Sequence, residues 1–225
     1  MVAYYHIAAM GHWREVVMEQ LSDLRGAPLQ RICVGVLGTE EASWWADQAL
    51  RISGLPYELR WHGANLTRYE IPTLEWMQTD VASGQASPVA YLHTKGVSQP
   101  SDRTKLYWRQ LMMRQLLQDM SEGMQGHELR CACWSHDAAF PHACGNFWLA
   151  SADYIRRLPL VAEHQQVWMH HPNRWDGPRL AAETWPGCGN PSWKAPLWDE
   201  PLWHDWWWDD RPELQQELIR WRMKG

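Results

Sequence analysis

The chain has 225 residues, of which 45% are apolar and 21% charged, with a formal net charge of −5 and a pI near 6.1. Tryptophan is over-represented, with 18 Trp against 2 Phe, and 10 of the 18 lie after residue 167. This length fits one large domain, and the aromatic content excludes a disordered chain. The mild acidity argues against a protein that neutralises a nucleic-acid backbone, because that task needs a basic face.

The composition also indicates a compartment. No run of about 18 apolar residues is present, which argues against a membrane span. Residues 1–17 have no basic start and are interrupted by His6, His12 and Arg14, which is not the pattern of a signal peptide. The cysteines are odd in number and mostly in apolar segments, which is typical of free thiols in a reducing compartment (Cys33, Cys131, Cys133, Cys144, Cys188). We therefore expect a cytoplasmic protein.

Strand and helix patterns alternate four times in the first 120 residues. Apolar runs bounded by glycine or polar residues predict strands at 2–9, 32–37, 57–61 and 88–93. Helical spacing of apolar residues predicts helices at 12–25, 41–52, 73–83 and 104–120. This alternation predicts an α/β fold of the Rossmann type, a mostly parallel sheet flanked by helices. In such sheets ligands bind at the carboxyl ends of the strands, where His6, Gly38 and the 93–96 string fall.

The second half of the chain is less regular. We expect a strand at 128–134, a helix at 152–158 and a final helix at 213–223. Seven prolines between residues 172 and 212 argue against long regular elements there. We therefore expect an irregular, tryptophan-packed cap. The predicted organisation is one domain at 1–188, with a Trp-rich extension at 189–225 packed on it.

Three short strings carry side chains suited to chemistry. Residues 91–96 (YLHTKG) place an imidazole and an ammonium at a strand end, where a lysine can neutralise a diphosphate, although any loop can contain such a turn. Residues 141–150 (PHACGNFWLA) hold His142 before a Gly-Asn turn, and the alternative is a turn with two core aromatics. Residues 182–187 (AETWPG) hold Glu183, which is either a fixed general base or a solvated surface carboxylate.

The order of these strings resembles a family of small bacterial and viral glycosyltransferases with a GT-A-like fold. The resemblance spans residues 2–187 and rests on His-Thr-Lys-Gly at 93–96, Trp-Arg at 108–109, His142 before Gly-Asn-Phe-Trp at 145–148, and Glu-x-Trp at 183–185. It implies transfer of a sugar from a nucleotide-sugar donor to a hydroxyl of a glycan-like acceptor, as in polysaccharide biosynthesis.

The chain departs from the GT-A pattern at the metal motif. No Asp-x-Asp occurs, and His93-Thr94-Lys95 stands in its place. One alternative is that Lys95 replaces the metal and stabilises the departing diphosphate by its charge. The other is that His93, with His142 or Asp137, binds Mn²⁺ or Mg²⁺. We favour the first alternative, in which no metal is held.

The resemblance also implies roles for individual residues. Glu183 is the expected catalytic base, with Asp137 second. The donor nucleotide and diphosphate are expected to contact a first group (His6, Ala8, Gly38, His93, Lys95, Arg109). For Arg109 a salt-bridged helix surface is the alternative. The donor sugar and acceptor are expected to contact a second group (His142, Gly145, Asn146, Trp185).

The C-terminal tryptophans alternate with Asp and Glu from residue 193 onward. Indole faces beside carboxylates suit a sugar, but packing of the cap against the domain is the favoured interpretation. Rival functions remain: a non-enzymatic carbohydrate-binding protein, a phage-type DNA-modifying glycosyltransferase, a glycoside hydrolase, and a zinc site at Cys131, Cys133, His142 and Cys144. Cys-x-Cys is not the usual zinc spacing, and the acidic balance disfavours duplex nucleic acid as a partner.

Overall fold

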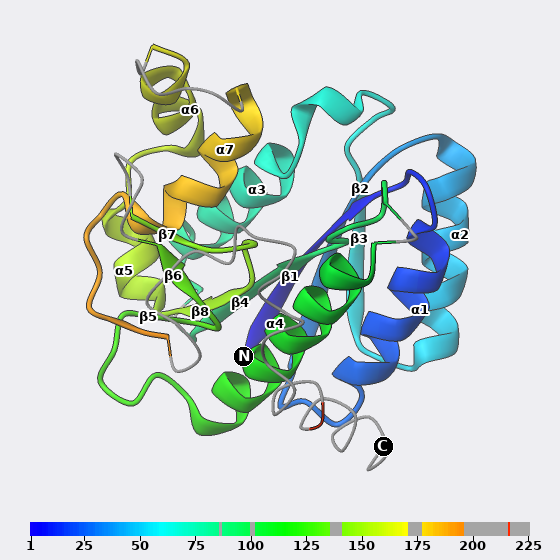
Figure 1. The fold of residues 1–225 in the computed structure, drawn as a ribbon, viewed down its shortest axis with the longest axis horizontal. Helices are drawn as coiled ribbons and strands as arrows, with labels where there is room; N and C mark the ends of the chain where they lie inside the picture. The colour runs from blue at the N-terminus through cyan, green and yellow to red at the C-terminus, as the bar shows by residue number, and fades with distance from the viewer. Residues whose placement is uncertain (86, 100–101, 136–140, 171–176, 196–215, 217–225) are drawn as a thin grey trace.

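The computed structural model describes residues 1–85, 87–99, 102–135, 141–170, 177–195 and 216. Its centre is a seven-stranded sheet in the order β3-β2-β1-β4-β8-β5-β9 (Figure 1). The strands are β1 (Val2–Ala8), β2 (Arg31–Leu37), β3 (Tyr57–Trp61), β4 (Val89–His93), β5 (Leu129–Cys131), β8 (Trp148–Ala150) and β9 (Trp193–Lys194). All neighbours are parallel except β8, which is antiparallel to both β4 and β5. The predicted α/β fold with a mostly parallel sheet flanked by helices is confirmed.

Helices cover both faces of this sheet. They are α1 (Trp13–Leu24), α2 (Glu40–Ser53), α3 (Ile71–Ala82), α4 (Arg103–Glu122), α5 (Ala152–Arg157), α6 (Val161–Met169) and α7 (Gly177–Thr184). Short elements complete the described chain: the 3₁₀ turns η1 (Leu66–Arg68) and η2 (Trp185–Gly187), and a hairpin of β6 (Trp134–Ser135) with β7 (His142–Ala143).

Alternate side chains of β1 pack into two separate hydrophobic cores, one on each face of the sheet. Tyr5 and Ile7 pack with apolar residues of α1, α2 and α4, while Val2 and Tyr4 pack with α3 and α5. A strand covered on both faces needs apolar or aromatic residues at every position, and β1 has them everywhere except at His6. The buried polar residue His6 is therefore an exception that needs an explanation.

The first four strands agree with the sequence prediction within two residues, and the second half agrees less well. The strand predicted at 128–134 is divided into β5 and β6. Within the segment 172–212, predicted as irregular, α7 is a regular helix of eight residues, and α6, of nine residues, precedes this segment. The predicted helix at 213–223 lies outside the described residues, apart from Gln216.

The described part of the C-terminal extension joins the sheet. β9 pairs with β5, and the Trp193 indole stacks on Trp134 at 5.3 Å between ring centroids. Trp193 therefore packs against the sheet, while the tryptophans that follow it lie outside the described residues. No helix in the described ranges is both long enough and apolar enough to cross a bilayer.

Candidate functional site

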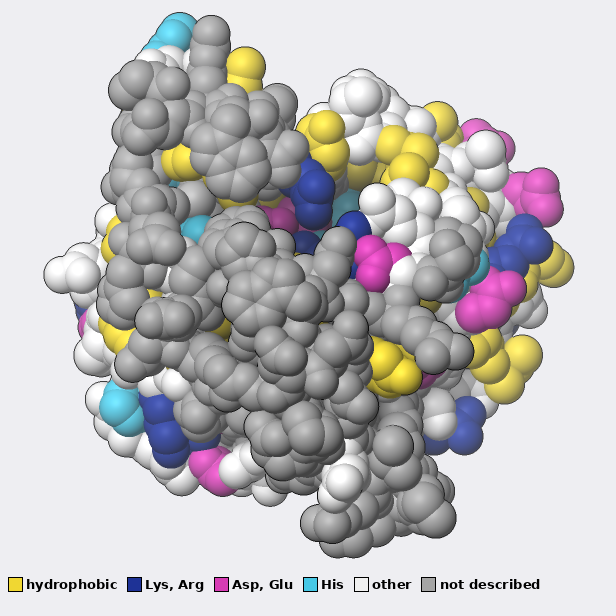
Figure 2. All heavy atoms as spheres, viewed as in Figure 1, with side chains coloured by type: hydrophobic (Ala, Val, Ile, Leu, Met, Phe, Trp, Pro, Cys, Tyr) yellow, Lys and Arg dark blue, Asp and Glu magenta, His cyan; other side chains and the backbone are white. Residues whose placement is uncertain are grey.

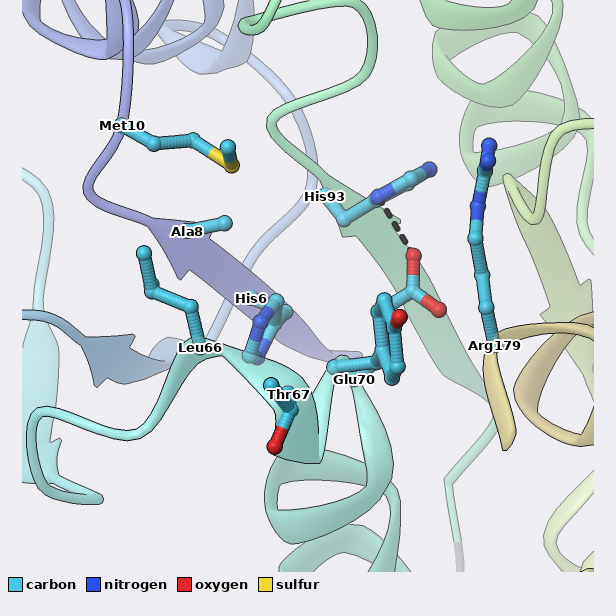
Figure 3. Close-up of a pocket in the computed structure, with 9 residues that line it drawn as sticks. His6, Ala8, Met10, Leu66, Thr67, Glu70, His93 and Arg179 are labelled. Atoms are coloured by element: carbon cyan, nitrogen blue, oxygen red, sulfur yellow. Dashed lines mark ion pairs between the residues drawn. The ribbon is translucent and has the colours of Figure 1, made fainter. Parts of the chain in front are cut away.

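A pocket of about 250 Å³ lies at the carboxyl ends of β1 and β4 (Figure 3). The chain runs outward from β1 to β2 and β3, then returns to the other side of β1 as β4. The crevice between β1 and β4 is thus the point where strand order reverses, which is where open α/β sheets bind ligands. The lining comes from β1, the segment before α3, β4 and α7 (His6, Ala8, Met10, Leu66, Thr67, Tyr69, Glu70, His93, Arg179).

Two histidines sit side by side on the floor of this pocket. His6 and His93 occupy paired positions on β1 and β4, and both are buried. Thr94 fixes the two strand ends, because its amide donates to the His6 carbonyl at 3.1 Å and its hydroxyl accepts from the Ala8 amide at 3.0 Å. The motif at 93–96 therefore places its side chains against the end of the first strand.

The His93 ring is held at both nitrogens. Nδ1 lies 2.6 Å from Oε1 of Glu70, and Nε2 lies 3.0 Å from the carbonyl oxygen of Gly145. A carbonyl only accepts, so Nε2 carries a proton. Burial raises the pKa of Glu70, but the contact with His93 and smaller contributions from His6 and Lys95 outweigh this, and the net pKa falls to about 2. The His93 ring is thus held in one orientation beside the pocket by contacts at both ring nitrogens.

The same geometry tests whether His93 can hold a metal. Nε2 donates to the Gly145 carbonyl and Nδ1 is occupied by Glu70, so neither ring nitrogen is free to coordinate and His93 does not fit a Mn²⁺ or Mg²⁺ ligand. Of the two residues proposed as its partners, His142 is buried and Asp137 lies outside the described residues. Within the described ranges, no group of three or more His, Cys, Asp or Glu side chains is placed to hold a metal ion, including the suggested cysteine site.

His6 is uncharged. Burial lowers its pKa to about 3, and its Nδ1 is 2.8 Å from the Thr73 hydroxyl. Its Nε2 and the Oε2 of Glu70 are both buried without a hydrogen-bond partner among the described residues. Such atoms are destabilising unless something satisfies them. Both residues line the pocket, so a bound polar ligand is well placed to do so.

Next to this pocket, Lys95 and Glu183 form a buried ion pair. Lys95 Nζ lies 3.4 Å from Glu183 Oε1, and both residues are 6% exposed. Arg179, one turn before Glu183 on α7, approaches the same oxygen at 3.8 Å. Burial raises the pKa of Glu183, but Lys95, Arg179 and His142 together outweigh burial and lower the net pKa, so the carboxyl is ionised.

Arg109 supports the loop of Lys95 rather than facing the pocket. Its guanidinium donates to the Lys95 carbonyl at 3.0 Å and to Glu19 at 3.2 Å. The Trp108 ring lies 4.9 Å from Lys95 Nζ, within cation–π range. Arg109 is salt-bridged, as in the alternative interpretation, but it is buried rather than on the helix surface, and its contact with phosphate stays a prediction.

The Gly145-Asn146 turn contacts the site through its backbone. Both residues have positive φ, 77° and 59°, and a Cβ at Gly145 would lie 2.4 Å from Met112 Sδ. The turn delivers the Gly145 carbonyl to His93. The Asn146 side chain accepts from the Trp148 indole at 2.7 Å, so it is tied to the core.

Three other residues that were expected to contact the donor or the acceptor lie outside the lining of this pocket. Trp185 is fully buried and its indole donates to the Pro159 carbonyl at 3.0 Å, so it packs the core instead of lining the pocket. Gly38 follows β2 and its carbonyl accepts from the Trp61 indole at 2.8 Å, outside the pocket lining. His142 is buried and close enough to Glu183 to lower its pKa.

Glu70 and Arg179 are site residues that the sequence prediction missed. Glu70 has no motif around it, since it immediately precedes α3 in a polar segment. Arg179 had a usable signal, because a spacing of four puts it on the same helix face as Glu183. In the space-filling view, basic, acidic and histidine side chains gather in a central hollow (Figure 2).

The fold and the pocket define an α/β protein with a pocket lined by charged residues at the ends of its parallel strands. The profile of a family described as "Domain of unknown function (DUF8361)" matches residues 4–183, and the chain belongs to this family. A comparison with curated proteins finds no match.

Two solved structures illustrate the similarity of fold. Glucosyl-3-phosphoglycerate synthase from Mycobacterium tuberculosis, crystallised with Mn²⁺, UDP and phosphoglyceric acid, is 14% identical with a TM-score of 0.42, over 97% of this chain and 76% of that one. HddC from Yersinia pseudotuberculosis is 10% identical with a TM-score of 0.39, over 71% of this chain and 80% of that one. Both TM-scores are below 0.5, so no activity is transferred from these proteins to this chain.

Proposed function

We propose that this protein is a glycosyltransferase that moves a sugar from a nucleotide-sugar donor to a hydroxyl of a glycan-like acceptor. The observation that carries the proposal is the placement of Lys95, Arg179 and Glu183 beside a pocket at the strand-order reversal. The sequence motifs at 93–96, 145–148 and 183–185 support the same function independently of the geometry.

Positively charged side chains stabilise the departing nucleoside diphosphate in this proposal. A nucleoside diphosphate leaves with the electron pair of the bond to the sugar, and its charge must be stabilised as that bond breaks. Lys95 and Arg179 supply two positive charges at one edge of the sheet. In this proposal they take the place of the metal that an Asp-x-Asp motif would hold.

Glu183 activates the acceptor hydroxyl in this proposal. Its carboxylate accepts the proton of the attacking hydroxyl, whose oxygen forms the new bond to the sugar. Without donor, that carboxylate is in contact with Lys95 and approached by Arg179. A diphosphate that recruits these two cations weakens both contacts. The pKa of Glu183 then rises, since burial is no longer offset, and the residue becomes a stronger base when donor is bound.

The deciding experiment is a thermal-shift screen of UDP-, GDP-, ADP-, TDP- and CMP-sugars, with and without Mn²⁺. A donor far above its Kd is expected to stabilise the fold by about 3 kcal/mol. A responding donor is then incubated with oligosaccharide acceptors, and release of the nucleotide is measured. If no nucleotide or nucleotide sugar shifts the transition, the proposal is wrong and a non-enzymatic carbohydrate-binding protein is favoured.

A further inference from the structure

A second pocket, of about 300 Å³, lies between α2 and the edge strand β3. It is lined by Glu40, Ser43, Trp44, Asp47, Leu59 and Trp61. None of these residues takes part in the site at β1 and β4. The volume is in the range of small-ligand sites, whereas a stable protein interface uses about 20–30 residues a side.

Two tryptophans of this pocket face solvent. Trp44 is 63% exposed and Trp61 is 45% exposed, while Trp134, Trp148, Trp168 and Trp185 are fully buried. The Trp61 ring is fixed, because its Nε1 donates to the Gly38 carbonyl at 2.8 Å. A large apolar ring that is anchored by its polar edge and left open on a face is typical of a binding surface.

The polar groups of the pocket are acidic. Asp47 accepts from the Tyr57 hydroxyl at 2.6 Å and from Arg51 at 2.8 Å. The hydrogen bond from Tyr57 is the main cause of the lowered pKa of Asp47. Glu40 is exposed in the first turn of α2. Among the described residues that line the pocket none is basic, so this lining does not favour a phosphate or an acidic sugar and its carboxylates repel both.

We propose that this pocket binds a neutral glycan chain. The apolar C–H faces of a pyranose stack on indole rings, and its hydroxyls donate to carboxylates such as Glu40 and to the Ser43 hydroxyl. This pocket adjoins Gly38, whose carbonyl accepts from the Trp61 indole, and it shares no lining residue with the pocket at β1 and β4. The proposal concerns binding alone and stands whether or not the chain transfers a sugar.

The test is calorimetric titration of the full chain with four six-unit oligosaccharides. Three are neutral (α-1,4-glucan, β-1,4-glucan and β-1,4-mannan) and one is anionic (polygalacturonate). At least one neutral chain is expected to bind with a Kd below about 5 mM, and the anionic chain at least about tenfold more weakly. Trp44→Ala is expected to weaken the neutral chain by about tenfold or more, since it removes one stacking face.

Matched variants show whether the glycan occupies this pocket. Ile52→Ala on the same helix, at a residue that is 70% exposed outside the pocket, is expected to leave the Kd unchanged within about twofold. Circular dichroism and thermal unfolding verify that each variant is folded. The proposal is overturned if every neutral chain has a Kd above about 50 mM. It is also overturned if Trp44→Ala binds as tightly as the unaltered protein, or if Glu183→Gln loses binding while Trp44→Ala keeps it. Sedimentation showing self-association that Trp44→Ala abolishes would also overturn it, because the occupant would then be a second copy.

Discussion

Lys95 and Glu183 lie 88 positions apart in the chain and meet in a buried ion pair, with Nζ 3.4 Å from Oε1. Lys95 follows the end of β4 and Glu183 is near the end of α7. Removing one member of such a pair leaves an uncompensated buried charge, which is strongly unfavourable. The pair therefore links the stability of the site to the chemistry proposed for it.

Glu183→Gln is expected to lower turnover by at least about 10²-fold, because the amide cannot accept the acceptor proton. Donor affinity is expected to change little, since the cations that hold the diphosphate remain. The measurement is kcat beside the donor Kd, with the exposed Glu15→Gln as the matched control. Unchanged turnover in Glu183→Gln would remove this residue from the mechanism.

Lys95→Met is expected to change the pH profile as well as donor affinity. Lys95 helps to hold the pKa of Glu183 below its usual 4.5. Glu183 therefore stays ionised between pH 5 and 7, and its ionisation causes no change of kcat/KM in that range. Without the ammonium, burial raises that pKa and activity falls as the pH drops through this range. Lys95→Arg keeps a cation and is expected to keep the flat profile. A flat profile in Lys95→Met would contradict the assignment.

Removal of divalent metal is expected to leave activity intact. Both ring nitrogens of His93 are already occupied, by Glu70 and by the Gly145 carbonyl, so the position that replaces Asp-x-Asp offers no free ligand atom from this ring. The assay compares initial rates after exhaustive EDTA treatment with rates after added Mn²⁺ or Mg²⁺. Activity that is lost with EDTA and restored by Mn²⁺ would refute this prediction.

Glu70→Gln is expected to destabilise the fold by about 2 kcal/mol, because the buried His93 ring loses its close contact with a carboxylate. Urea unfolding measures the change, and Glu75→Gln on the same helix is the control. A double-mutant cycle with His93→Gln is expected to give a coupling energy above about 1 kcal/mol. Additive effects of the two substitutions would show that the residues do not interact.

Acid is expected to destabilise the protein through its buried neutral histidines. Burial lowers the pKa of His6 to about 3 and of His164 to about 4, against 6.5 in the unfolded chain. Between these values the unfolded state binds more protons, so stability falls as the pH drops below 6.5, by up to about 1.4 kcal/mol per pH unit for each histidine. His6→Asn is expected to reduce that slope, and the exposed His170→Gln is expected not to. A slope unaffected by His6→Asn would assign the acid sensitivity elsewhere.

Local sequence determined the first half of the fold. The strands at 2–9, 32–37, 57–61 and 88–93 are confirmed within two residues, because continuous apolar runs bounded by glycine or polar residues specify buried parallel strands directly. The division of the strand predicted at 128–134 could not be seen in this way. Its two parts have different partners: β5 pairs with β8 and with β9, which is distant in the chain, whereas β6 forms a hairpin with β7.

The sequence by itself brought His93, Lys95 and Glu183 to attention as residue types in suggestive strings, and it placed the first two at a strand end. Only the tertiary structure decided what each one faces. It joined Lys95 to Glu183, turned Arg109 inward to the Lys95 carbonyl, buried Trp185, and supplied Glu70 as the partner of His93. The physical reason is that charge pairing and burial depend on distances between segments that are far apart in the chain, whereas strand and helix patterns depend on neighbours.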